Sequence, residues 1–169
     1  MPNWCMNNLT ISHEDTEKVN EFVEAYKRGE TCEYYLPTPK RDDGELSDDW
    51  WDYRVNNWGT KWDFGGENEF IAQSGNGVIC SFDTAWAPPI GLYEHLQLLG
   101  FGVEATYFEP GMGFAGRWID GEDDHYDGGV LEDFPQDLVE EYNMTEWYED
   151  DDEDDAPFKL VSVPKHPES

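Results

Sequence analysis

The strongest constraint on the fold is a β-hairpin signal that lies between two amphipathic helix patterns. Two strand-like segments, residues 68–74 and 77–84, are separated by Gly75-Asn76, a dipeptide typical of a tight turn between antiparallel strands. On either side of the hairpin, apolar residues recur at the three- and four-residue spacing of a helix face. These residues are Val19, Phe22, Val23 and Tyr26 in the first pattern, and Leu92, Leu96 and Leu99 in the second. The chain therefore has to pack two helices against a sheet that contains this hairpin.

Further strand patterns lie before the first helix pattern and after the second. Residues 4–12 place Leu9 and Ile11 on one face, residues 101–108 alternate, and residues 114–120 follow a Gly-rich turn. The predicted order is strand, helix, strand, strand, helix, strand, with one added strand. This order predicts an α+β chain with a ferredoxin-like, split βαβ antiparallel sheet and two helices on one face.

Three regions elaborate this core. Residues 30–66 contain Pro, Gly and Asp without a regular period, and we expect a long, largely irregular aromatic loop inserted into the core of residues 1–120. We expect residues 121–155 to form an acidic extension with one helix and residues 156–169 to form a tail. The helix is predicted from its apolar side, which consists of Leu138, Val139 and Tyr142.

The insertion is dense in aromatic residues. The stretch WWDYRVNNWGTKWD, residues 50–63, contains four tryptophans and a tyrosine. Buried rings supply the apolar area that keeps a long loop ordered, so we expect an aromatic cluster that pins the insertion to the sheet. Its predicted members are Trp4, Trp58, Trp62 and Trp86. Trp50 and Trp51 are adjacent and do not easily share one pocket, which predicts that at least one of them is exposed.

Charge restricts the classes of partner. The 169 residues include 39 acidic and 10 basic side chains, which gives a net charge of −29. Such a field repels nucleic acids and anionic membranes and attracts basic proteins. No apolar run reaches the roughly 20 residues that a membrane span needs. Cys5, Cys32 and Cys80 are too few for a plain iron–sulfur cluster, and we expect reduced thiols and no cofactor.

Four local strings together resemble one known family: MPNWCMNNLTI at the start, then WGTKWD, FDTAWAPP and YFEPGMGFAGRW. They resemble the YubB-like family of phage and plasmid proteins, which has a ferredoxin-like domain. The resemblance covers roughly residues 1–120, the range of the split βαβ core. It implies this fold and an origin on a mobile element, but no particular activity. The odd number of widely spaced cysteines, together with the lack of a signal-peptide pattern, predicts a location in the cytoplasm of the host cell.

Carboxylates interleaved with aromatic rings are the feature that points most directly to function. Carboxylates at phosphate-like intervals can imitate a nucleic-acid backbone, and exposed rings add anchors. We therefore predict a non-enzymatic accessory protein that binds or inhibits a basic host protein, such as a nucleic-acid-processing or defence enzyme, without binding nucleic acid itself. The predicted contact residues are Asp48, Asp49, Trp50, Trp51, Asp124, Asp127, Trp147, Tyr148 and Glu149. An ordinary solvated surface, or acidity suited to high salt, is the competing explanation of the charge.

A small-ligand or cation-binding domain is the alternative function. Asp120, Glu122 and Asp124 stand at positions one, three and five of an acidic loop, as in calcium sites, but the glycine and the final glutamate of that motif are missing. These three residues are weak candidates for metal ligands. The four histidines show no zinc-binding spacing, and EPGMGFAG lacks the pattern of a phosphate loop. This string predicts a tight turn, with Gly116 allowing a close backbone approach within a strand.

Overall fold

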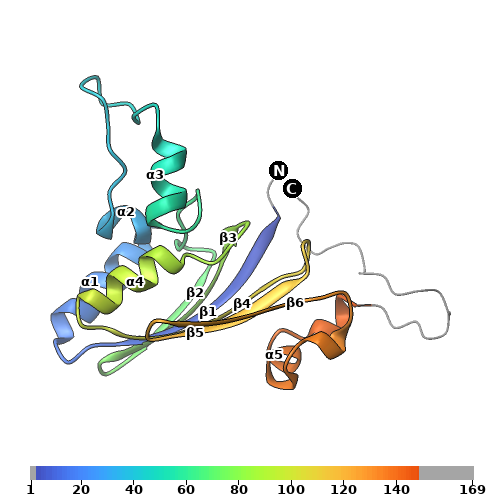
Figure 1. Cartoon of the computed structure of the whole chain (residues 1–169). Helices are drawn as coiled ribbons and strands as arrows, with labels where there is room; N and C mark the ends of the chain where they lie inside the picture. The colour runs from blue at the N-terminus through green and yellow to red at the C-terminus, as the bar shows by residue number, and fades with distance from the viewer. Residues whose placement is uncertain (1–2, 149–169) are drawn as a thin grey trace.

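A computed structural model describes residues 3–148, and these residues form a six-stranded antiparallel sheet with five α-helices. The strands are β1 (Trp4–Ser12), β2 (Phe70–Ser74), β3 (Gly77–Ala85), β4 (Gly102–Glu109), β5 (Phe114–Ile119) and β6 (Glu122–Asp127). The helices are α1 (Thr16–Lys27), α2 (Thr31–Tyr35), α3 (Trp50–Asn57), α4 (Ile90–Leu98) and α5 (Gln136–Glu141), with short 3-10 segments η1 (Leu131–Asp133) and η2 (Met144–Glu146). Figure 1 shows the sheet as a central layer, with α1, α2 and α4 on one side and α5 on the other.

The strand order is β2-β3-β1-β4-β5-β6, so the first strand lies in the middle of the sheet. β1 pairs antiparallel with β3 on one side and with β4 on the other. The predicted hairpin is confirmed, because β2 and β3 pair up to Ser74 and Gly77 on either side of the turn. Gly75 in this turn has a φ of +60°, which glycine adopts without a steric cost.

The face of the sheet toward α1 and α4 carries the larger hydrophobic core. Cys5, Asn7, Leu9 and Ile11 are buried at alternate positions of β1, as expected for a strand with one covered face. The predicted faces of both helices are buried, except that Leu99 follows the end of α4 and is 41% exposed. The residues of α1 and α4 in the core are Val19, Phe22, Val23, Tyr26, Leu92, Tyr93 and Leu96.

The opposite face of the sheet is covered at one end only. Residues 131–148 fold back under the strands and form a second hydrophobic cluster with Phe108 of β4 and Ala115 of β5. Leu138 and Val139 of the predicted apolar side are buried there, whereas Tyr142 follows the end of α5 and is partly buried. The members from this segment are Phe134, Leu138, Val139, Met144, Trp147 and Tyr148. Within residues 3–148, no other segment covers the rest of this face.

Two parts of the chain are more regular than the sequence indicates. Residues 122–127, which we assigned to the acidic extension, form β6 and pair with β5 over its whole length. Within residues 30–66, α2 and α3 are helical, and α3 begins inside the tryptophan-rich stretch. No residue of α3 is fully buried, and five of the six residues of β6 are exposed. Because neither α3 nor β6 buries an apolar face, neither shows the periodic pattern that predicts α1 and α4. The five residues of α2 are too few to show such a pattern.

All three cysteines, Cys5, Cys32 and Cys80, are free and buried. Desolvation raises the pKa of each thiol above its ordinary value, which keeps the groups protonated and unreactive near neutral pH. Between residues 3 and 148, every helix is too short or too polar to cross a membrane.

Candidate interaction surfaces

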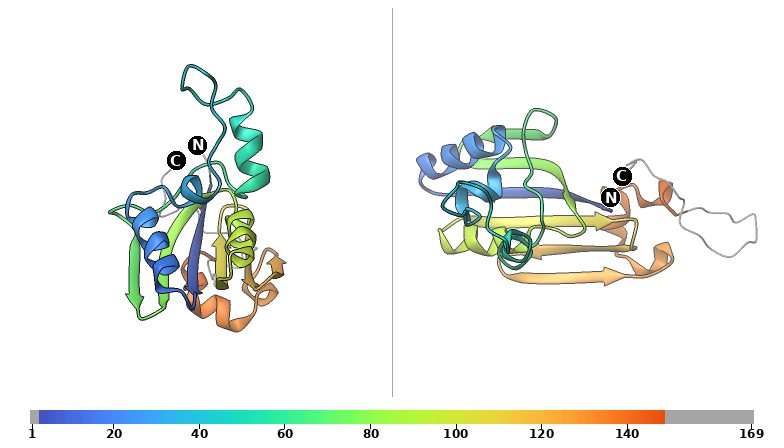
Figure 2. Two further views of the ribbon diagram at one scale, coloured as in Figure 1. Left: turned by 90° about the vertical axis from the view of Figure 1, so that its left-hand side faces the viewer. Right: turned by 90° about the horizontal axis from the view of Figure 1, so that it is seen from above.

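Residues 36–62 leave α2, rise away from the sheet and return to it, and we call this segment the arm. It contains α3 and the loop before it, and Figures 1 and 2 show both projecting beyond the layer of α1 and α4. A bridge between Lys40 and Leu46 closes the loop. Gly44, inside this loop, has a φ of +89°. The arm therefore presents a turn and a helix to solvent, away from the main core.

A ladder of cations and aromatic rings holds the arm together. The guanidinium of Arg54 lies 4.5 Å from the ring centre of Trp58 and 5.2 Å from that of Trp50. Trp50 stacks on Trp62 with the ring centres 5.8 Å apart. Lys61 Nζ lies 5.5 Å from the ring centre of Trp62. Cation–π contacts contribute about 0.5–2 kcal/mol each, depending on desolvation, so the ladder orders a segment with few core residues of its own.

Arg54 also joins the two ends of the arm. Its Nε donates a hydrogen bond to Thr38 Oγ1 at 2.9 Å, and its Nη1 donates to the carbonyl oxygen of Lys61 at 3.1 Å. The carboxylate of Glu33 lies 3.7 Å from Nη2. The Arg54 side chain is only 13% exposed, so these contacts are largely shielded from water.

The arm is anchored to the core at its base. Trp58 is fully buried, and its Nε1 donates a hydrogen bond to the carbonyl oxygen of Leu36 at 2.8 Å. The carboxylate of Asp63 accepts hydrogen bonds from the backbone N–H groups of Cys32 and Glu33 at 2.7 and 2.8 Å. Burial raises the pKa of Asp63, while these N–H donors oppose the shift. The base of the arm is therefore fixed by one buried ring and one partly buried carboxylate.

The four tryptophans predicted to form one cluster occupy different environments. Trp58 lies in the main core, whereas Trp62 is 43% exposed and stacks on Trp50. Trp86 is 47% exposed and follows β3 with a φ of +71°. Trp4 is half-buried at the start of β1. The prediction of a single cluster is wrong, because residue spacing does not reveal which rings meet across a fold.

Four predicted contact residues lie together on the arm. Asp48 and Asp49 precede α3 and are exposed, and Trp51 in its first turn is 50% exposed. Trp50 is half-buried within the ladder. The exposure of Trp51 confirms the prediction that at least one of the two adjacent rings faces solvent. Asp48 pairs with Arg41 at 3.2 Å, an exposed ion pair that contributes little.

The other predicted contact residues lie elsewhere. Asp124 and Asp127 are exposed on β6, and they point to opposite faces of the sheet because strand side chains alternate. Trp147 and Tyr148 are only 7% and 4% exposed and pack into the second hydrophobic cluster. This corrects the expectation that they are surface anchors, since their rings hold the C-terminal segment against the sheet. Glu149 lies outside the described residues.

The candidate metal ligands are separated by the geometry of the β5–β6 hairpin. Asp120 and Gly121 form its turn, with φ values of +45° and +102°. Asp120 Oδ1 accepts a hydrogen bond from the backbone N–H of Val103 at 3.0 Å, while Glu122 and Asp124 belong to β6. Across residues 3–148, no group of three or more His, Cys, Asp or Glu side chains is placed to hold a metal ion.

A polar cluster with acid–base groups lies on the helix-covered side of the same hairpin. The Tyr107 hydroxyl donates to Asp123 Oδ1 at 2.7 Å and lies 3.1 Å from His125 Nδ1. Gly116 makes this possible, because a Cβ there would overlap the Tyr107 ring, and the predicted close approach at this glycine is confirmed. Burial and the neighbouring carboxylate raise the pKa of Tyr107. The hydroxyl therefore stays protonated near neutral pH and acts as a hydrogen-bond donor.

The second surface is the uncovered part of the sheet face opposite α1 and α4, which sequence reasoning missed. We call it the open face and define it by Asn8, Thr10, Ile79, Glu104, Thr106 and Ile119, with Phe70 and Arg117 at its borders. The three apolar side chains of the open face are exposed: Phe70 by 56%, Ile79 by 53% and Ile119 by 37%. Alternation of polar and apolar residues along the first strand was the available signal, because it predicts one solvated face.

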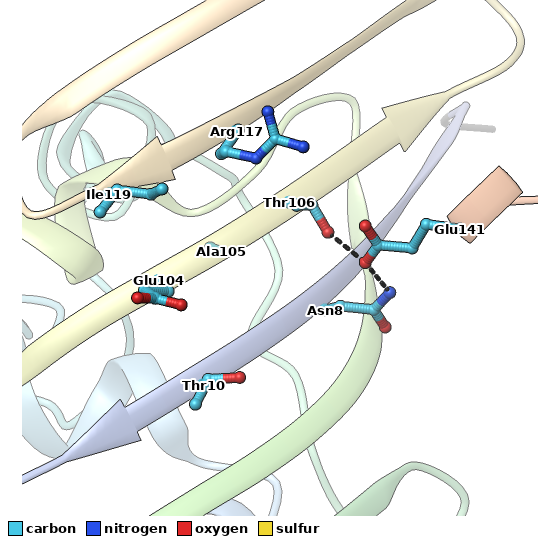
Figure 3. Close-up of a pocket in the computed structure, with 8 residues that line it drawn as sticks. All are labelled: Asn8, Thr10, Glu104, Ala105, Thr106, Arg117, Ile119 and Glu141. Carbon is cyan, nitrogen blue, oxygen red and sulfur yellow. Dashed lines mark hydrogen bonds between the residues drawn. The ribbon is translucent and has the colours of Figure 1, made fainter. Parts of the chain in front are cut away.

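The open face is hollowed beside α5, as Figure 3 shows. Glu141 reaches from the end of α5, and its Oε2 accepts hydrogen bonds from Asn8 Nδ2 and Thr106 Oγ1, both at 2.7 Å. Arg117 forms an ion pair with Asp137 of α5. A cavity of about 190 Å³ lies on the β4–β5 side of Glu141, and a groove of about 430 Å³ lies on its β1–β3 side. The strands beside α5 therefore offer room for another molecule.

Comparison with known proteins assigns no family, because no family model, no curated protein and no solved structure matches the chain. A function therefore has to be inferred from the arm and the open face.

Proposed function

We propose that this chain is a non-enzymatic phage or plasmid accessory protein that binds a basic host protein and thereby inhibits or redirects it. The start of α3 is the observation that carries the proposal. There the exposed ring of Trp51 stands next to the exposed carboxylates Asp48 and Asp49 on a projecting arm. Exposed aromatic side chains serve as anchors in interfaces, and carboxylates steer a basic surface toward them.

The rigidity of the arm supports this role. The contacts of Arg54 with Trp50 and Trp58 fix α3 before any partner binds. A surface that is already ordered loses less conformational entropy on association, so more of the contact energy contributes to affinity.

The acidity of the chain supports the choice of partner. A net charge of −29 favours association with a strongly basic surface, and the attraction weakens as salt screens it. The DNA- or RNA-binding cleft of a nucleic-acid-processing or defence enzyme is such a surface. In this proposal the carboxylates of the arm occupy positions that phosphates otherwise take, so the chain competes with nucleic acid for the cleft.

We further infer that β1, α1, β2, β3, α4 and β4 form a ferredoxin-like unit, as in the YubB-like family that the chain resembles. The strand order β2-β3-β1-β4, the antiparallel pairing and the position of α1 and α4 on one face support this inference. The hairpin β5–β6 and the segment after it would then be additions to that unit.

The experiment first captures a partner from host lysate on the immobilised chain. The partner is then purified, and its affinity for the chain and for the variants is measured. The test variant is D48N/D49N, with W51A as a separate variant. The matched control is E21Q/E24Q, which removes the same two charges from exposed positions of α1. We expect a basic partner that is displaced by salt and by double-stranded DNA, and that binds the arm variants about tenfold or more weakly than the control. Salt-independent binding, or equal losses in test and control variants, contradicts the proposal.

A further inference from the structure

One amphipathic helix of this chain already packs on the sheet face opposite α1 and α4. α5 buries Leu138 and Val139 against the strands, in a cluster with Phe108 and Ala115. Its last residue, Glu141, is hydrogen-bonded to the strands. The face continues beyond this edge as the open face, without a covering element within residues 3–148. In the described part of the chain, the layer to which α5 belongs therefore covers only part of this face.

Exposed isoleucines mark the uncovered part. Ile79 pairs with Thr10, Thr10 with Glu104, and Glu104 with Ile119. The two isoleucines thus lie in one row that crosses four strands, β3-β1-β4-β5. Neighbouring strands are about 4.8 Å apart, so the row is roughly 14 Å long. At about 1.5 Å per residue, a helix of roughly ten residues spans it.

Carboxylates lie within this row and beside it. Glu104 lies between the isoleucines, and Glu122 of β6 continues the row beyond Ile119. Glu141 borders the open face at α5, where Arg117 is already paired with Asp137. The negative field disfavours nucleic acid and a second copy of the same face, and it attracts Lys and Arg side chains. The occupant that matches both features has an apolar stripe flanked by basic residues.

We propose that the open face binds a basic amphipathic helix of the partner protein, lying beside α5 and extending its layer. Its apolar stripe contacts Ile79 and Ile119, and its basic side chains pair with Glu104 and Glu141. This inference rests on the proposed function, because it assumes a basic protein partner. It adds a second docking site to the arm and names the secondary structure that the site accepts.

The test uses the full chain and two synthetic peptides of the same Leu and Lys composition, about 14 residues long. One peptide places leucines at helical spacing and the other is scrambled. We expect the amphipathic peptide to bind at least about tenfold more tightly, with the largest amide NMR shifts on β1 and β4. The variant I79T/I119T keeps β-branched side chains suited to strands and should weaken binding about tenfold. The control Leu98→Ser alters a side chain that is 84% exposed on α4, across the sheet, and should not change binding.

Several outcomes overturn the inference. Equal binding of the scrambled peptide shows that charge alone suffices. Loss of binding in both the I79T/I119T variant and the Leu98→Ser control shows that the open face is not specific. Shifts confined to the arm place the peptide there, which leaves the proposed function standing and removes the second site. Dimerisation of the chain through the open face would assign that surface to a second copy. The capture experiment with arm variants tests the proposed function separately from all of these.

Discussion

Replacing Arg54 with alanine tests whether one side chain orders the arm. The guanidinium lies against the rings of Trp58 and Trp50 and donates hydrogen bonds to Thr38 and Lys61. Alanine has the highest helix propensity, so the substitution does not lower the intrinsic helix propensity of α3. Any destabilisation therefore reports the contacts of the guanidinium.

The expected magnitude follows from those contacts. Two cation–π interactions contribute about 1–4 kcal/mol together, and two hydrogen bonds contribute about 1–3 kcal/mol together. All four depend on one side chain, so their contributions are coupled and do not simply add. We expect Arg54→Ala to lower the free energy of unfolding by about 2–3 kcal/mol, a large part of the stability of a domain of this size.

Urea unfolding followed by tryptophan fluorescence measures this change, and trypsin cleavage after Lys61 reports opening of the arm. Arg54→Lys keeps the charge but loses the planar fork that reaches two acceptors, so it should recover about half of the loss. Arg41→Ala is the matched control from the same arm, where the side chain is 47% exposed and makes only surface ion pairs. Arg41→Ala should lower the free energy of unfolding by less than about 0.5 kcal/mol.

The reasoning is refuted if Arg54→Ala changes stability by less than about 0.5 kcal/mol and leaves trypsin cleavage unchanged. It is equally refuted if Arg41→Ala costs as much, because a shielded ladder and an exposed ion pair would then be energetically alike.

Three further predictions concern the body of the protein. Gly116→Ala should lower the free energy of unfolding by about 2–3 kcal/mol in chemical denaturation, because the added methyl overlaps the Tyr107 ring. The control Gly77→Ala should lower it by less than about 1 kcal/mol, because its methyl would lie 3.6 Å from the nearest neighbour. Similar losses at both sites would contradict the packing argument. Burial raises the pKa of the fully buried Glu109. The favourable contribution of this carboxyl to folding stability is therefore complete below its pKa in the unfolded chain, about 4.3, and is lost as pH rises through its pKa in the folded protein. Thermal melts should therefore show the native chain gaining stability as pH falls from 7 toward 5, with a flatter dependence for Glu109→Gln; an unchanged slope would exclude this carboxyl as a cause. Raising NaCl from about 10 mM to 0.5 M should increase the melting temperature, since salt screens the repulsion within a chain of net charge −29, and a decrease would mean that attractive ion pairs dominate.

Periodicity predicted the elements that bury one face. α1, α4 and the β2–β3 hairpin follow apolar patterns that burial against the sheet requires. α3 and β6 escaped prediction because their side chains are mostly exposed, so no apolar pattern marks them. Trp147 and Tyr148 were misassigned for the opposite reason, since their acidic surroundings in the sequence concealed a buried position in the fold.

The amino-acid sequence by itself determined the order of the elements that bury an apolar face, the strong negative charge and the exposure of one of two adjacent tryptophans. These properties depend on composition and on neighbours along the chain. Only the tertiary structure decided that Trp58 enters the core while Trp62 stacks on Trp50, and that Ile79 and Ile119 share one row on an open face. Such partnerships join residues far apart in sequence, and they are set by strand register and packing, which no local pattern records.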